Sequence, residues 1–325
     1  MSDRDDNVIL FPKLQTTLEQ ESLSALTNKN YREALDKLDQ LLEHGVDHHE
    51  IMMGKLICLM ELDQFEEAEE LSEKLMSRHD TYYFEYVHIY LTMLFQTGQY
   101  ELVIETSNAV LDHQETIPDP FREQFSQLRD LSTHMREEVI AEESAKLTRI
   151  LFKAHANQDH HLQWITVEKL RSLGAIPKQS MESYLTDHNV HPMVKTGLFL
   201  WYQEQSVNRP LEIHKLGVSG WRNPVDTYDL SNSATIKQTK LLINEIEQHN
   251  PTLYKQLDQL LTRFTYVRYP LIPEPDQAPL IAEALKHIGH GIASIHNKGM
   301  ASSTILAYAE EINLCDGLYL SMMDA

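Results

Sequence analysis

A short pattern recurs three times in the first third of the sequence at an almost constant spacing. The stretches NKNYREALDKLDQLL, LDQFEEAEELSEKLM and QTGQYELVIETSNAVL each place an aromatic residue at the start of an amphipathic segment. Tyr31 and Phe65 are 34 residues apart, and Phe65 and Tyr100 are 35 residues apart. A fixed period of this size is typical of an array of helical repeats, so at least part of the chain is expected to fold as a solenoid.

Each repeat is predicted to be a pair of helices joined by a tight turn. In the second repeat, IMMGKLICLMEL has apolar residues at helical spacing, DQ forms the turn, and FEEAEELSEKLMSRH is the returning helix. Ala34, Ala68 and Val103 lie three residues after each aromatic residue, where the two helices would cross closely. One such pair cannot bury both of its apolar faces, so neighbouring pairs must stack.

The period stops after DHQETIPDPF, and the rest of the chain reads as further helices with one exception. The segment 121–156 is expected to be a long helix with one break. In RPLEIHKLGVSGWRNPVDTYDL, Leu211, Ile213 and Lys215 alternate with other residues and glycines follow, which predicts a short hairpin or extended lobe. Trp221 in this lobe is interpreted as a plug over the core.

The expected fold class is therefore all-α, a helical-repeat solenoid followed by a second helical region with a small β-hairpin. With 11 glycines and 12 prolines in 325 residues, the composition also favours helices. The predicted parts are an N-terminal extended segment at 1–14, three helix–turn–helix repeats at 15–117, a helical capping region at 118–205, the lobe at 206–232 and a C-terminal helical region at 233–325.

Charge is distributed unevenly along the chain. The formal net charge is −21; residues 1–150 hold 31 Asp and Glu against 13 Lys and Arg, whereas residues 151–325 hold 18 against 15. The first half would repel a phosphate backbone, so nucleic acid is not expected as its partner. No apolar run is long enough to predict a membrane span, and no signal peptide is recognisable. Because Cys58 and Cys315 are too few for a disulfide framework, a cytoplasmic location is expected.

The three repeats resemble the tetratricopeptide repeat (TPR) family over residues 15–117. Its signature has glycine or a similar residue before an aromatic residue and a small residue three positions later. The matching stretches are Gly98-Gln99-Tyr100 and Phe65-Glu66-Glu67-Ala68. Leu56 and Leu91 depart from the signature, which has a small residue at that place on the first helix, and the closing proline is absent. The stretch NVILFP, the three repeats and the further helical half together resemble cytosolic TPR proteins of Gram-positive bacteria, a resemblance that brings no known activity with it. The stretch HNVHPMVKTGLFLWY resembles HEAT-type repeats.

In the TPR family, the inner face of each first helix lines a groove for an extended or helical peptide, and the resemblance implies such a groove here. The implied groove residues are Glu19 in the first repeat, Glu50, Met53, Ile57, Met60 and Glu61 in the second, and Glu85, His88, Thr92 and Phe95 in the third. Family members that bind a C-terminal carboxylate use Lys, Asn and Arg at these places, and none is present. Apolar side chains rimmed by carboxylates instead indicate a protein or peptide partner with a basic or apolar segment. The open alternative is that the protein's own later helices cover this face.

No metal ion or other cofactor is expected from the histidines. Asp47-His48-His49-Glu50 and Asp159-His160-His161 each hold adjacent histidines, which point about 100 degrees apart on a helix and are interpreted as solvated turn residues. His287 and His290 could share a helix face, with His296 beyond them. No HExxH motif and no cysteine accompany them, so a zinc site is not predicted.

No catalytic motif stands out either. The sequence has no GK[ST] phosphate-binding motif and no GxSxG nucleophile elbow. The acidic stretch FEEAEE is interpreted as a solvated helix face on which Glu70 pairs with Lys74. The favoured function is a non-catalytic protein-interaction scaffold or adaptor. Two alternatives stay open: a regulatory protein that senses a peptide, and an enzyme with an unrecognised site.

Overall fold

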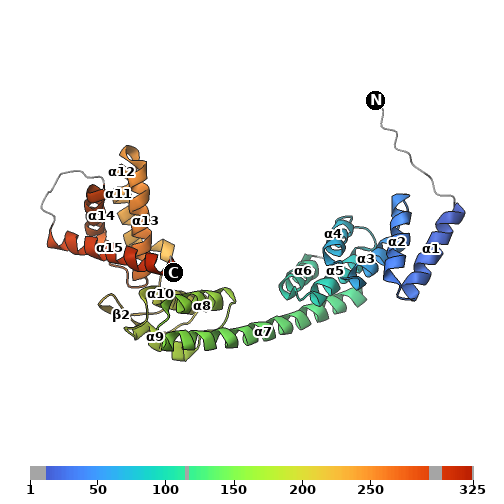
Figure 1. The fold of residues 1–325 in the computed structure, drawn as a ribbon, viewed down its shortest axis with the longest axis horizontal. Helices are drawn as coiled ribbons and strands as arrows, with labels where there is room; N and C mark the ends of the chain where they lie inside the picture. Colours follow the sequence, from blue (N-terminus) through green and yellow to red (C-terminus); the bar gives the residue numbers. More distant parts are fainter. Residues whose placement is uncertain (1–11, 114–116, 293–301, 324–325) are drawn as a thin grey trace. The chain divides into compact units, whose positions relative to one another are not determined.

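The computed structural model describes residues 12–113, 117–292 and 302–323 (Figure 1). The chain divides into two compact units, Met1–Val139 and Ile140–Ala325. We call the first the repeat unit and the second the C-terminal unit. The expected all-α class, with a helical-repeat array followed by a second helical region and a small hairpin, is confirmed. None of the helices within the described ranges is long and apolar enough to cross a membrane.

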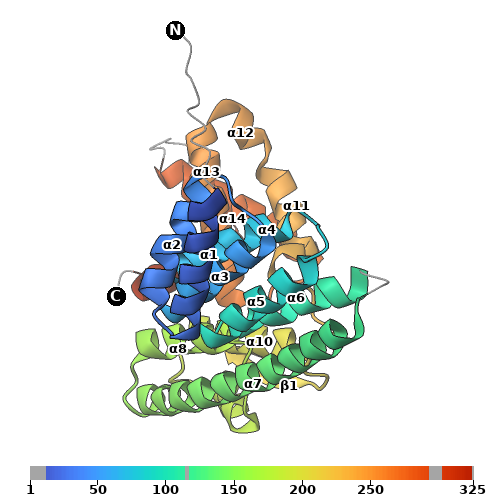
Figure 2. The same cartoon turned by 90° about the vertical axis from the view of Figure 1, so that its right-hand side faces the viewer.

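The repeat unit is built from three consecutive helix pairs (Figure 2). They are α1 Pro12–Thr27 with α2 Tyr31–Glu43, α3 His49–Glu61 with α4 Phe65–Met76, and α5 Tyr83–Gln96 with α6 Tyr100–His113. The second helix of each pair begins at the repeated aromatic residue, as predicted. Ala34, Ala68 and Val103 are fully buried. Compact side chains at these positions let the two helices of a pair pack closely against each other.

The turn inside each pair has the same backbone conformation in all three repeats. Lys29, Asp63 and Gly98 have φ angles of 58°, 58° and 74°, in the left-handed region. The next residue in each turn donates its backbone N–H to the carbonyl five residues earlier, at 2.8 to 2.9 Å. This hydrogen bond satisfies one of the carbonyls that the end of a helix leaves without a partner, so the left-handed residue closes the first helix and starts the second.

A single helix, α7 Asp119–Ala156, runs from the repeat unit into the C-terminal unit, and Figure 1 draws it without interruption. The break expected in segment 121–156 is therefore wrong. The physical reason is that this segment contains neither glycine nor proline and is rich in good helix formers. Phe125 near its start is buried in the core of the repeat unit, and Leu151 near its end is buried in the core of the C-terminal unit.

The C-terminal unit consists of helices and one two-stranded sheet. Its longer helices are α8 His160–Ser172, α10 Pro192–Glu204, α11 Ala234–Ile243, α13 Pro251–Arg268, α14 Ala278–Ile292 and α15 Ser303–Met323. Its short elements are α9 Ser183–Thr186, α12 Glu245–His249 and the strands β1 Leu211–Lys215 and β2 Val218–Arg222. Helix α10 is buried along most of its length, so the core of this unit forms around it.

The two strands form the antiparallel hairpin that the sequence predicts, with Leu211 opposite Arg222 and Lys215 opposite Val218. Leu216 and Gly217 at its tip have φ angles of 50° and 76°, which suit the right-handed twist of a two-residue hairpin turn. Alternate residues of β1 are buried as expected. Trp221, however, is 61% exposed, so its interpretation as a plug is wrong.

The register explains the exposure of Trp221. It pairs with Glu212, whose side chain points to the face of the hairpin away from the buried residues Leu211 and Ile213. The third buried residue of β1 is charged. The Lys215 Nζ donates to the Thr196 Oγ1 at 2.5 Å and to the Tyr269 carbonyl at 2.6 Å, and burial lowers its pKa well below the usual value.

Candidate peptide-binding face of the repeat unit

The ten residues implied by the family resemblance all lie on the first helices of the three pairs. We call them the first-helix face. They are Glu19 on α1, Glu50, Met53, Ile57, Met60 and Glu61 on α3, and Glu85, His88, Thr92 and Phe95 on α5. None of the ten is fully buried: Glu50, Ile57 and Glu61 are exposed, and the other seven are half-buried. The face is therefore accessible in part.

The apolar members of the face differ in how much surface they leave free. Met53 packs against the apolar cluster that contains Leu75 and Tyr86, and Phe95 packs at an edge against Tyr100 with ring centroids 5.6 Å apart. Both side chains thus contribute to the internal core. Ile57 is 40% exposed. Leu23, which precedes Ile57 by one period of 34 residues, is 65% exposed, so these two are the open apolar side chains of the face.

His88 is a member of the face that lies beside a later helix of the protein's own chain. Its ring lies 6.4 Å from the rings of both Phe121 and Phe125, centroid to centroid, at the start of α7. This burial lowers the pKa of His88, so its imidazole is neutral at pH 7. The alternative of covering by later helices therefore holds locally, at the α5 end of the face.

Two histidines at the start of α3 connect the carboxylates of the face. The ring nitrogens of His48 lie 3.5 Å from a Glu19 oxygen and 3.6 Å from a Glu50 oxygen. The His49 Nε2 lies 2.8 Å from a Glu85 oxygen, and its ring stacks on Tyr82 with centroids 3.7 Å apart. The interpretation of both histidines as solvated turn residues is thus wrong for His49, whose side chain is only 13% exposed.

The signal for His49 was present in the sequence. The next repeat begins with adjacent aromatic residues, Tyr82 and Tyr83, and stacked helix pairs bring the start of α5 beside the start of α3.

The carboxylates of the first-helix face leave it with a negative charge. Within the described ranges, no Lys or Arg forms an ion pair with Glu19, Glu50, Glu61 or Glu85.

No cluster of three or more His, Cys, Asp and Glu side chains that could hold a metal ion occurs in the described part of the chain. His160 and His161 are half-buried, so their interpretation as solvated turn residues is wrong, and the His161 Nδ1 lies 3.0 Å from the Met322 carbonyl oxygen. His287 is exposed, while the His290 side chain and His296 lie outside the described residues.

Neither cysteine has the environment of a nucleophile. Burial raises the pKa of Cys58 to about 11 and that of Cys315 to about 12. Both side chains therefore remain protonated thiols at neutral pH. Both are free and buried, and each packs as a small apolar residue in the core of its unit.

The C-terminal unit holds a cavity of about 670 Å³ between α10, α11 and α13. Three of its polar lining side chains are already paired within the protein. The Gln203 Oε1 accepts from the Tyr269 hydroxyl at 2.7 Å, Glu204 binds Arg171 through both carboxylate oxygens, and Lys240 lies 2.6 Å from Asp258. The cavity therefore presents little polar chemistry that a ligand could use.

Comparison with known proteins identifies one clear relationship. No protein-family model matches the chain, and no solved structure matches it. The TPR repeat-containing protein YsoA of Bacillus subtilis (strain 168) is 30% identical over 297 residues, which covers 89% of this chain and 88% of YsoA. Because an alignment of this length exceeds either unit alone, the relationship includes both the repeat unit and part or all of the C-terminal unit. The chain belongs to the family of TPR repeat-containing proteins.

Proposed function

We propose that the protein is a non-catalytic interaction scaffold or adaptor whose first-helix face binds a basic or apolar segment of a partner protein. The observation that supports this proposal is the juxtaposition of open apolar side chains with carboxylates that no Lys or Arg of the described ranges neutralises. Ile57 is 40% exposed, and Glu50 and Glu61 on the same helix are both exposed. Membership of the TPR family is consistent with a role in protein–protein interaction. We place this scaffold in the cytoplasm, with which two free, buried cysteines are compatible.

The apolar and the charged residues of the face should contribute differently to binding. Burial of Ile57 and Leu23 removes apolar surface from water and therefore slows dissociation. Exposed carboxylates act through a field that salt screens, so Glu50 and Glu61 should mainly attract a basic segment and speed its encounter. Two classes of variant should thus separate the two contributions.

The test is surface binding kinetics with two synthetic peptides that alternate leucine with either lysine or glutamate, at low and high salt. The lysine peptide should bind more tightly. Ile57→Ala should raise its off-rate by about 5- to 30-fold, equivalent to about 1–2 kcal/mol. Glu50→Gln with Glu61→Gln should lower the on-rate and flatten its salt dependence.

Leu102→Ala is the matched control for Ile57→Ala, because Leu102 is equally exposed (39%) but lies on α6, outside the first-helix face. It should change neither rate. A wild-type preference for the glutamate peptide, or equal off-rates for Ile57→Ala and Leu102→Ala, would contradict the proposed function.

A further inference from the structure

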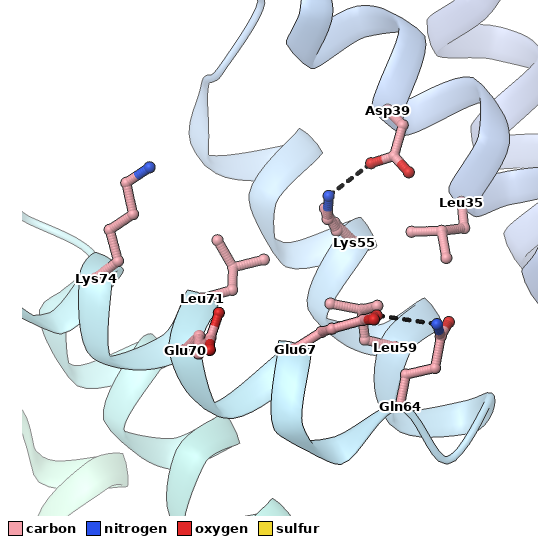
Figure 3. A pocket seen from close by; sticks show the side chains of 9 residues that line it. All are labelled: Leu35, Asp39, Lys55, Leu59, Gln64, Glu67, Glu70, Leu71 and Lys74. Carbon is pink, nitrogen blue, oxygen red and sulfur yellow. Dashed lines mark hydrogen bonds and ion pairs between the residues drawn. The ribbon is translucent and has the colours of Figure 1, made fainter.

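The repeat unit has a second concave surface between α2, α3 and α4, shown in Figure 3. We call it the α2–α4 depression. Its volume is about 430 Å³. The lining residues are Leu35 and Asp39 on α2, Lys55 and Leu59 on α3, Gln64 before α4, and Glu67, Glu70, Leu71 and Lys74 on α4. It thus draws on helices of two neighbouring repeats.

This depression lies on the opposite side of α3 from the first-helix face. Lys55 precedes Ile57 by two residues and Leu59 follows it by two. Since successive residues of an α-helix are about 100 degrees apart, both point about 160 degrees away from Ile57. A ligand in the depression would therefore not contact the exposed side chain of Ile57, and the two surfaces can be tested separately.

Three leucines from three helices form the floor of the depression. Leu59 is buried, and Leu35 and Leu71 are half-buried at the same surface. Each leucine also packs into the apolar clusters of the repeat unit, so the floor is held in place from below. This arrangement offers a partly exposed apolar surface to a ligand at the junction of two repeats.

The charged groups around this floor are unequally satisfied. Asp39 and Lys55 neutralise one another across α2 and α3, with the Lys55 Nζ 2.6 Å from a carboxylate oxygen. Within the residues that the structure describes, Glu67 accepts only the amide N–H of Gln64, at 2.9 Å, and no Lys or Arg pairs with it. In the described part of the chain, Glu70 has no hydrogen-bond or ion-pair partner.

Lys74 does not supply the missing cation. Figure 3 shows its side chain extending away from Glu70 with no ion pair drawn between them, so the ion pair expected between these two residues is not formed. Helical spacing puts Glu67 and Glu70 three residues apart on neighbouring parts of one face of α4. Two carboxylates without a cationic partner thus stand beside an apolar floor.

We propose that the α2–α4 depression binds an arginine side chain presented by a partner protein beside apolar residues. The aliphatic stem of arginine would cover the leucine floor, and its guanidinium would donate to Glu67 and Glu70. Arginine fits better than lysine, because its planar guanidinium donates several hydrogen bonds to carboxylates at once and is more weakly hydrated. The site is independent of the first-helix face and goes beyond the function proposed for that face.

The test uses the full chain and a peptide labelled at its N-terminus, fluorescein-Ala-Leu-Arg-Leu-Ala-Arg-amide, in fluorescence anisotropy. Glu67→Gln with Glu70→Gln should raise the Kd by about fivefold or more, because two charge-assisted contacts become neutral. The matched control is Glu66→Gln with Glu73→Gln, which removes the same charge from exposed positions of the same helix that do not line the depression. It should change the Kd by less than about twofold.

Two further measurements make the assignment specific. Lys74→Gln should lower the Kd, because it removes an uncompensated cation from the rim, and loss of fold cannot mimic this gain. A peptide with lysine in place of arginine should bind several-fold more weakly. Circular dichroism checks that the Gln variants remain folded.

Each contrary outcome overturns the proposal in a distinguishable way. Equal weakening by the two α4 pairs means that only the general negative field attracts the peptide. Weakening by Glu50→Gln with Glu61→Gln, but not by the Glu67 and Glu70 pair, means that the peptide lies on the first-helix face. Equal affinity for the lysine peptide, or no measurable binding of the arginine peptide, removes the arginine site while leaving the proposed function of the first-helix face untouched.

Discussion

The two units of this protein achieve a folded core in different ways. The repeat unit holds 29 Asp and Glu against 11 Lys and Arg, whereas the C-terminal unit holds 20 against 17. In the repeat unit each helix pair packs on the pair that follows it in sequence. In the C-terminal unit the core joins distant segments, since the Thr196 Oγ1 donates to the Tyr266 carbonyl at 2.7 Å. Local, periodic packing is therefore visible in a sequence, and distant packing is not.

The interiors differ as well as the connections. Among the described residues, the buried polar side chains of the repeat unit are serines, Ser22, Ser72, Ser107 and Ser132. The C-terminal unit buries Lys195, Lys215 and Arg268. Burial lowers the pKa of Lys195 to about 8, while its Nζ donates to the His214 carbonyl at 2.6 Å. Stability that depends on protonation should thus be concentrated in the C-terminal unit.

The largest expected effect is a loss of stability in one unit at a time, caused by substitutions at the two ends of α7. Phe125→Ala should destabilise the repeat unit and Leu151→Ala the C-terminal unit, each by about 3–5 kcal/mol, because each removes a fully buried side chain. All three tryptophans, Trp164, Trp201 and Trp221, lie in the C-terminal unit, so tryptophan fluorescence reports on that unit alone. The urea midpoint measured by tryptophan fluorescence should fall for Leu151→Ala and stay unchanged for Phe125→Ala. Circular dichroism, which reports on the helices of both units, should detect the destabilisation by Phe125→Ala.

Val139→Ala is the control for this pair, because Val139 lies on the same helix and is 52% exposed. It should change stability by less than about 0.5 kcal/mol. If both core variants shift both signals by the same amount, the two units unfold as one cooperative block, and the contrast between them does not extend to stability.

A second prediction concerns pH. Burial, followed by the nearby charges of His160 and Lys215, lowers the pKa of His191 to about 4, and its Nδ1 accepts the backbone N–H of Met193 as the N-cap of α10. The unfolded state, with a pKa of about 6.5, takes up the proton first. Neutral His191 therefore contributes fully to the free energy of unfolding above about pH 6.5. This contribution, about 3 kcal/mol, is lost as the pH falls to about 4.

His191→Asn keeps a side-chain acceptor at the N-cap but does not titrate. Urea unfolding by tryptophan fluorescence at several pH values should show a flatter acid decline for this variant than for the wild type. Parallel declines in the two proteins would show that His191 takes no part in the pH dependence of the C-terminal unit.

The smallest effect tests the repeat register. Ala68 is fully buried at the crossing of α3 and α4, so Ala68→Leu should destabilise the repeat unit by about 1–3 kcal/mol through overpacking. Thermal unfolding by circular dichroism measures it. Glu66→Leu places the same leucine side chain at an exposed position of α4 and should leave the midpoint almost unchanged. An unchanged midpoint for Ala68→Leu itself would mean that residue 68 is not at a close helix crossing.

The parts of the fold that the sequence predicts are those with local, repeated chemistry. The spacing of Tyr31, Phe65 and Tyr100 locates three helix pairs, and the alternation in Leu211, Ile213 and Lys215 locates the hairpin. A run without glycine or proline indicates the continuity of α7, whereas the division of its two ends between separate cores is not visible in the sequence. The exposure of Trp221 was missed because the outer face of a hairpin depends on its register against distant helices.

The candidate sites show the same limit. The ten residues of the first-helix face could be placed on their helices from the repeat alone, but not the covering of His88 by Phe121 and Phe125. The α2–α4 depression was not predicted, because its floor combines Leu35, Leu59 and Leu71 from three helices. The carboxylates of α4, taken alone, are typical of a solvent-exposed helix face.

The left-handed turns within the helix pairs have a consequence for how such a protein evolves and can be redesigned. Lys29, Asp63 and Gly98 share a torsion angle and a hydrogen-bond pattern but no side-chain chemistry. The same torsion angle and hydrogen bond also end helices outside the repeats, at Gln158 and Ser206, so this backbone conformation tolerates different side chains at the turn. Lysine and aspartate hold this conformation at a steric penalty of about 1 kcal/mol that glycine avoids. The third repeat already has glycine at this turn, so Lys29→Gly and Asp63→Gly are the substitutions that should stabilise the turns of the first two repeats.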